Sequence, residues 1–205
     1  MIAPLPFAVL AVFCAFVLLR LGHHLKVWIS GREKGEFAGN LEPGWVRFLW
    51  PAFSICLVAM VISFGFHHTS EICGWMRHFE IPVPDLIQWV GLGMAVSSLA
   101  GLHWVHRALG HFFSANLSLR EDHQLITEGP YAYVRHPMYT ALLGFFVGVA
   151  VLSANLAIIA FCIGISLLLL RRINREELML EERFGDSYRE YRTKTGRILP
   201  PLQRG

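Results

Sequence analysis

Apolar residues follow one another in five long runs, and polar residues gather between the runs and at the end of the chain. Runs of this length are typical of membrane helices, because in lipid the backbone groups must be hydrogen-bonded within the segment itself. We therefore predict an all-α integral membrane protein with five transmembrane helices. The runs are Pro4–Leu21, Phe48–Phe66, Leu86–Leu109, Met138–Ser153 and Leu156–Leu170.

The composition agrees with this pattern. Of the 205 residues, 54% are hydrophobic and only 16% are charged, which is more apolar than a soluble domain of this size requires. The four cysteines form no CxxC pair, so neither a disulfide framework nor a thiolate metal site is indicated.

Basic residues alternate between the two ends of the predicted helices. All of the 18 Lys and Arg residues except Arg77 fall on one side of the membrane in the five-helix arrangement. The positive-inside rule then predicts an N-terminus outside and a C-terminus in the cytoplasm. The net charge of +3 reflects this topology, and no basic stripe interleaved with aromatic residues indicates nucleic-acid binding.

The last two runs are joined only by "SAN" at 153–155, which predicts a tight helical hairpin. Each run has roughly 16 apolar residues, or about 24 Å of helix, which is short of a hydrocarbon core of about 30 Å. The polar flanks of the hairpin should therefore meet at its open, cytoplasmic end. We divide the chain into a three-helix membrane region, 1–110, and a catalytic region, 111–205, comprising a loop, the hairpin and a cytoplasmic C-terminal helical tail.

Small residues recur at a spacing of four in two of the runs, which predicts close helix packing in lipid. They are Gly93, Ser97 and Gly101 in the third run and Gly144 and Gly148 in the fourth.

The densest set of polar and aromatic groups, "GPYAYVRHPMY", lies directly before the fourth run. Pro137 suits the first position of a helix, and the residue before a proline is pushed out of the α region, so His136 should lie at the helix cap. Arg135, His136 and the exposed N–H groups of the helix start together make a carboxylate receptor. The alternative is an interfacial arginine flanked by aromatic anchors.

The tail carries acids on a predicted helix below this loop. Glu177 and Glu181 are four residues apart and share a face, which is unfavourable unless a cation compensates. Gly185 is predicted to end that helix and Asp186 to cap a short second one. A solvated charged helix is the alternative interpretation.

"QLITEGPYAYVRHPMY", the hairpin, "REE", "FGDSY" and a final arginine–proline stretch together resemble the isoprenylcysteine carboxyl methyltransferase family, whose wider set includes phospholipid N-methyltransferases. The resemblance covers about residues 110–201 and implies an integral membrane enzyme that uses S-adenosylmethionine. One departure is Ala141, where the family often has glycine. The resemblance implies a cofactor site formed by Gln124, Gly129, Tyr131, Val134, Arg135, His136, Pro137, Tyr139, Glu176, Tyr188 and Tyr191, with Glu177, Arg197 and Arg192 as catalytic candidates.

We therefore expect methyl transfer from a cytosolic cofactor to a lipophilic or lipidated acceptor within the membrane, foremost the carboxylate of an isoprenylcysteine. A carboxylate acceptor needs a cation, for which Arg197 and Arg192 are the candidates. An amine acceptor needs a base instead, for which Glu177 and Glu176 are the candidates. Phospholipid or small-amine N-methylation and thiol S-methylation are the alternatives.

Other function classes fit less well. An NADPH-dependent sterol-type reductase resembles this C-terminal region, but such enzymes have more helices. His103, His106 and His111 cluster without a carboxylate partner, so we predict no metal site. A membrane scaffold or transporter fragment is the non-enzyme alternative.

Overall fold

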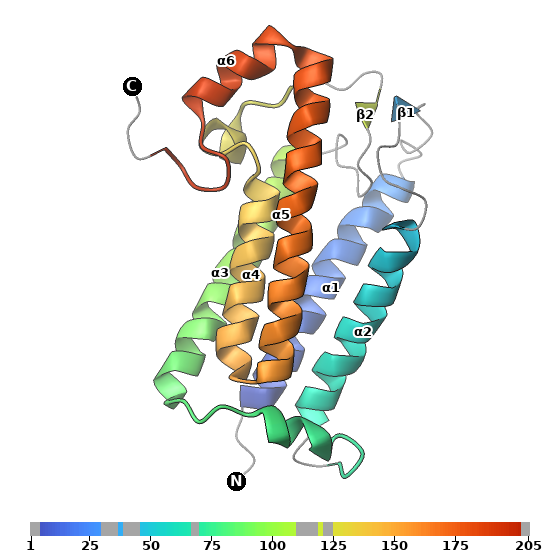
Figure 1. Ribbon diagram of the computed structural model, residues 1–205, viewed down its shortest axis with the longest axis vertical. Helices are drawn as coiled ribbons and strands as arrows, with labels where there is room; N and C mark the ends of the chain where they lie inside the picture. Colours follow the sequence, from blue (N-terminus) through green and yellow to red (C-terminus); the bar gives the residue numbers. More distant parts are fainter. Residues whose placement is uncertain are drawn as a thin grey trace.

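The five apolar runs form five long helices. The computed structural model describes residues 5–29, 37–38, 46–66, 70–109, 119–120 and 125–201. A sixth helix, a short one, follows the fifth (Figure 1). The helices are α1 (Leu5–Ile29), α2 (Val46–Phe66), α3 (Asp85–Leu109), α4 (Pro137–Ser153), α5 (Leu156–Phe184) and α6 (Asp186–Lys194). The all-helical prediction is thus confirmed in helix number and position.

Two of these helices, over Asp85–Ala108 and Leu156–Phe184, are long and apolar enough to cross a bilayer by the criteria of length and composition. Shorter apolar stretches lie at Phe7–His23, Leu57–Phe66 and Pro137–Ser153 within the described part of the chain. The protein therefore has apolar membrane-type helices, and a crossing by all five stays a prediction.

Helix α1 is longer than its apolar run. The run ends at Leu21, but the helix continues to Ile29. Arg20 therefore lies within the helix, nine residues before its end.

Helices α3 and α4 form the most extensive contact between two elements of the structure. A Cβ atom placed on Gly148 of α4 would meet the backbone of Ala95 and Gly91 of α3, so the two backbones touch. A Cβ atom placed on Gly144 would instead meet the side chain of Ser98. The predicted role of Gly144 and Gly148 is therefore confirmed.

The predicted partner stripe on α3 is largely wrong. Gly93 has open space around it, and Ser97 is exposed and bonds to carbonyl groups of its own helix. Gly101 does face α4, where a Cβ added to it would contact the Ala141 methyl at 3.9 Å. Ala141 is thus accommodated against a glycine of the neighbouring helix.

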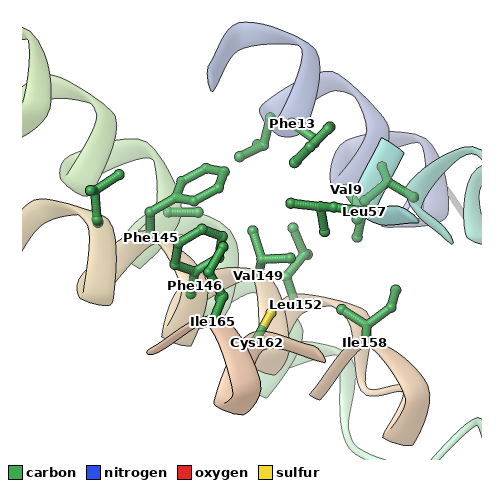
Figure 2. Close-up of a cluster of buried hydrophobic side chains, with 14 of the residues drawn as sticks. Val9, Phe13, Leu57, Phe145, Phe146, Val149, Leu152, Ile158, Cys162 and Ile165 are labelled. Carbon is green, nitrogen blue, oxygen red and sulfur yellow. The ribbon is translucent and has the colours of Figure 1, made fainter. Parts of the chain in front are cut away.

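The hydrophobic core lies where α1, α2, α4 and α5 converge (Figure 2). Phe145 is 1% exposed and stacks on Phe16 of α1 with ring centroids 4.6 Å apart. Figure 2 shows Val9, Leu57 and Ile158 pointing toward the same interior. This core fixes the relative position of the helices that carry polar groups at their ends.

Helices α4 and α5 form the tight hairpin that their short connection predicted. A buried asparagine closes it. Asn155 caps α5 by accepting hydrogen bonds from the N–H groups of Ala157 and Ile158, at 3.1 and 3.4 Å. Its amide donates to the Met76 carbonyl oxygen at 2.9 Å, in the 3₁₀-helix η2 (Gly74–Phe79). The α2–α3 connection is thereby attached to the closed end of the hairpin.

At the opposite end, α5 extends well past its apolar run. Residues 171–184 form a polar continuation of the same helix, which ends at Gly185 as predicted. Asp186 is the first residue of α6 and gives no side-chain cap, so its predicted capping role is wrong. The short strands β1 (Phe37–Ala38) and β2 (Leu119–Arg120) pair antiparallel at the end of the molecule where α6 lies (Figure 1).

Candidate active site

The loop before α4 places the first set of functional side chains. We call residues 125–136 the motif loop. It contains the 3₁₀-helix η4 (Gly129–Ala132), in which Gly129 has a φ of +62° and Pro130 is buried. His136 then caps α4 with φ −124° and ψ 58°, and Pro137 is the first helical residue. The predicted helix start is confirmed.

The end of the chain runs alongside this loop. We call residues 195–201 the terminal segment. Its backbone pairs with the motif loop in parallel: the N–H groups of Arg135 and His136 donate to the carbonyl oxygens of Gly196 and Arg197, at 2.8 and 3.1 Å. The Thr140 hydroxyl, one turn into α4, donates to the Ile198 carbonyl oxygen at 2.6 Å. Backbone and side-chain bonds thus fix this segment to the start of the hairpin.

Gly196 is required for this pairing. A Cβ atom built on Gly196 would overlap the carbonyl oxygen of Leu199. Any other residue there would displace the terminal segment, and with it Arg197. Val134, which is bridged to Gly196, is 6% exposed.

Two arginines and a histidine converge on one carboxylate. Glu177 Oε1 lies 3.1 Å from Arg135 Nε and 3.3 Å from His136 Nε2, and Glu177 Oε2 lies 3.1 Å from Arg197 Nε. The side chains of Arg135 and His136 are 9% and 2% exposed, and that of Glu177 is 16% exposed. We call these four residues the Glu177 cluster. It joins the motif loop, the polar continuation of α5 and the terminal segment.

The surroundings of Glu177 keep it ionised. Burial raises its pKa, but hydrogen bonds from His136 and Arg135 and the charges of His136 and Arg197 outweigh burial. Together they lower the pKa from 4.5 to about 2. Glu177 is therefore an anion at any physiological pH and a very weak base.

Arg135 also connects the cluster to α6. Its Nη1 donates to the carbonyl oxygen of Arg192 at 3.0 Å and to that of Thr195. Of the acids that the sequence placed below this loop, Glu177 contacts Arg135 and His136 directly, whereas Glu181 pairs with Arg189 and Arg192.

The side chain of Arg192 lies elsewhere. It bonds to Glu181 at 3.3 Å, as Arg189 does at 3.0 Å, and both arginine side chains are more than half exposed. Only the Arg192 backbone reaches the Glu177 cluster. Arg197, in contrast, adds a hydrogen bond to Asn174 of α5.

Tyrosines surround the cluster as protonated groups. The Tyr191 hydroxyl donates to the Tyr131 carbonyl oxygen at 2.7 Å. Burial, with Glu176 and Tyr191 nearby, raises the pKa of Tyr131, and burial raises that of Tyr191 to about 12. Both hydroxyls thus keep their protons at neutral pH.

Tyr188 differs from its neighbours. Its side chain is fully buried, and its hydroxyl has no hydrogen-bond partner among the described residues. Burial and the nearby Glu177 raise its pKa, so the group is a buried donor beside the Glu177 cluster. An unsatisfied buried hydroxyl is costly, which favours a ligand that completes it.

Tyr139 lies on the other side of His136, with ring centroids 5.8 Å apart. It is 3% exposed, and its hydroxyl interacts with Glu176 and Arg172 of α5. Tyr139 therefore contacts both the Glu177 cluster and the polar continuation of α5.

The structure thus brings most of the sequence candidates together, with the side chain of Arg192 outside the group and Gln124 outside the described residues. Sequence reasoning missed four residues that contribute to the site, namely Thr140, Asn174, Thr195 and Gly196. Of these, only the threonine–glycine pair directly before Arg197 gave a signal in the local sequence.

The sequence model for the isoprenylcysteine carboxyl methyltransferase (ICMT) family matches residues 90–182. A probable protein-S-isoprenylcysteine O-methyltransferase of Oryza sativa subsp. indica is 38% identical over 153 residues, which cover 70% of this chain and 76% of that protein. The chain belongs to the ICMT family. The family makes it a membrane methyltransferase.

Other relatives agree with this membership. The protein-S-isoprenylcysteine O-methyltransferase of Schizosaccharomyces pombe is 26% identical over 201 residues, which cover 90% of this chain and 81% of that one. The solved structure of a eukaryotic intramembrane Ras methyltransferase, ICMT, superposes with a TM-score of 0.60 and 21% identity. The match covers the whole of this chain and 70% of that one. The ICMT fold therefore extends over the first three helices, which the sequence motifs did not cover.

Proposed function

We propose that this ICMT-family chain transfers a methyl group from S-adenosylmethionine to the carboxylate of an isoprenylated cysteine within the membrane. The observation that carries the proposal is the Glu177 cluster, which three separate parts of the chain assemble at one end of an apolar helical bundle. The relatives named for this activity support the choice of substrate.

The residues around the cluster fit the cofactor. Its amino acid end carries an ammonium and a carboxylate, which require an acid and a cation close together. Glu177 and Glu176 supply acids, and Arg135, His136 and Arg197 supply donors. The buried Tyr188 hydroxyl adds a donor without a partner among the described residues. When bound, the cofactor supplies an activated methyl group on a sulfonium.

The reaction makes few chemical demands on the residues of the chain. With the cofactor bound, the methyl group would pass to an acceptor oxygen, and the electron pair of the broken carbon–sulfur bond would leave with the sulfur. No proton moves when the acceptor is a carboxylate. Alignment and exclusion of water are therefore the main requirements. The bonds that fix the motif loop to the terminal segment provide the alignment.

The charge state of Glu177 favours this reaction over N-methylation. An ammonium acceptor must lose a proton before it attacks, and an efficient base has a pKa near the working pH. Glu177, with a pKa of about 2, is a poor base. Membership of the ICMT family also argues against the NADPH-dependent reductase.

We further propose that all five long helices cross the membrane, with the N-terminus outside and the C-terminus in the cytoplasm. Residues 111–205 then form the catalytic region on the cytoplasmic side, reached by the polar cofactor from water. Residues 1–110 form a membrane region that a lipidated substrate and membrane lipids contact. The distribution of Lys and Arg supports this orientation.

The test combines binding and turnover with detergent-purified protein. Labelled S-adenosylmethionine should bind, NADPH should not compete, and label should pass to N-acetyl-S-farnesylcysteine as a base-labile methyl ester. Tyr188→Phe should weaken cofactor binding, whereas the exposed Tyr133→Phe should not. Label in an amine product, or cofactor binding that survives in the double variant Arg135→Ala and Glu177→Ala, would overturn the proposal.

A further inference from the structure

A second polar cluster lies in the bundle, supplied by the region before the motif loop. Arg20 of α1 donates from Nη1 to Nε2 of His106 on α3, with 3.4 Å between the nitrogens. Because a guanidinium only donates, Nε2 accepts and the His106 ring proton is on Nδ1. The rings of His23 and His106 stack with centroids 4.3 Å apart and planes 8° from parallel. We call Arg20, His23 and His106 the α1–α3 cluster.

This cluster faces the inside of the bundle. Leu18, Leu21 and Leu25 of α1 are 69%, 60% and 54% exposed and form one face of the helix. Arg20 and His23 lie between them in sequence but contact His106, which is 3% exposed, on the inner side of the bundle. A charged side chain within an apolar helix costs free energy, and such residues usually belong to a functional site.

The cluster adjoins the proposed reaction site. Arg20 Nη1 lies 3.8 Å from the sulfur of Met138, the residue between Pro137 and Tyr139. Tyr139 and Arg172 also lie close enough to Arg20 to interact with it electrostatically. Tyr139 in turn contacts His136 of the Glu177 cluster. The buried Tyr139 therefore lies near both clusters.

We propose that Arg20 binds the carboxylate of the methyl acceptor. The inference rests on the proposed function and assigns a residue of the first helix to substrate recognition. A guanidinium holds a carboxylate through paired hydrogen bonds and leaves a lone pair free to attack. His106 and His23 position the guanidinium from the bundle side.

Location favours Arg20 over the two tail arginines proposed from the sequence. The side chains of Arg197 and Arg192 are 41% and 52% exposed at the polar end of the molecule. Arg20 instead lies on an apolar helix whose outer face carries exposed leucines. An acceptor whose prenyl chain stays in lipid presents its carboxylate at that depth.

The experiment measures recognition separately from turnover. Two probes are used: N-acetyl-S-farnesylcysteine, and its carboxamide, which has the same prenyl chain without the charge. Binding of each to the purified protein and the KM of the carboxylate probe are compared for the wild type, Arg20→Gln, Arg20→Lys and the matched control Arg189→Gln. Binding of S-adenosylmethionine to each variant shows whether the Glu177 cluster is intact.

Arg20→Gln should weaken binding of the carboxylate probe and raise its KM by about 10- to 100-fold, the range for a charge-assisted hydrogen-bonded pair. Binding of the carboxamide and of the cofactor should not change, and Arg20→Lys should retain part of the preference for the charged probe. Arg189→Gln should match the wild type.

An unchanged preference for the charged probe in Arg20→Gln would overturn the inference, as would an equal loss of both probes. If Arg20→Gln does not fold, the same comparison in Arg20→Lys decides. A wild type that binds the charged probe through Arg20 but does not methylate it would refute the proposed function and leave this inference standing.

Discussion

Replacing Glu177 by glutamine should destabilise the protein by an amount that the structure allows us to work out. The pKa of the carboxyl group falls from 4.5 to about 2 in the folded protein. At about 1.4 kcal/mol per pKa unit, this corresponds to about 3 kcal/mol of stabilisation at neutral pH. Solvent screening reduces the figure, because the side chain is 16% exposed. We expect a loss of about 2 kcal/mol in Glu177→Gln, or about 4 to 8 °C in Tm.

The assay is thermal unfolding followed by tryptophan fluorescence in detergent. Because the folded-state pKa is depressed, the stabilisation is fully present above the unfolded pKa near 4.5 and disappears as the pH falls through about 2. At pH 3 only about two fifths of this stabilisation remains. The Tm values of the wild type and Glu177→Gln should therefore approach each other there. The exposed Glu190, which pairs with Lys194 four residues on, provides the control variant Glu190→Gln, with no measurable shift expected.

Two results would refute this reasoning. One is a Tm of Glu177→Gln equal to that of the wild type at pH 7. The other is a difference that stays constant from pH 7 to pH 3, because it would then arise from packing and not from charge.

Three further substitutions test other parts of the structure. Gly196→Ala should displace the terminal segment and reduce cofactor affinity more than tenfold in a binding assay, because a Cβ atom overlaps a neighbouring carbonyl oxygen. Gly164→Ala, which has open space, should bind normally. Asn155→Ala should lower the free energy of unfolding by about 1–2 kcal/mol through loss of the α5 cap, measured by denaturant titration. Tyr191→Phe should cost about 1 kcal/mol in the same titration, since one hydrogen bond to the motif loop is lost; an unchanged midpoint would contradict either expectation.

Structural features that depend on residues close together in the sequence could be predicted. The apolar runs located five helices, and the three-residue connection located the hairpin. Pro137 placed the start of α4 and put His136 at its cap, because proline restricts the residue before it. The compensating cation that Glu177 required is present as Arg135.

Features that depend on packing could not be predicted. A stripe of small residues shows that a helix packs closely but not how the helix is rotated, so Gly91 and Ala95 form the contact in place of Gly93 and Ser97. Hydrogen bonds between the motif loop and the terminal segment are made by backbone groups, which leave no pattern in the side chains. The pairing of Arg192 with Glu181 depends on the angle between α5 and α6, which the turn at Gly185 sets.

The backbone contact between α3 and α4 also restricts the path by which a lipophilic substrate can enter the bundle. Where Gly148 meets Gly91 and Ala95, a single methyl group already has no room, so a branched polyprenyl chain cannot slip between these two helices. A lipid-borne molecule bound for the neighbourhood of Tyr139 must leave the bilayer along another pair of helices. A larger residue at position 148 would therefore not create an entry path between α3 and α4. It would only disturb the packing of the bundle.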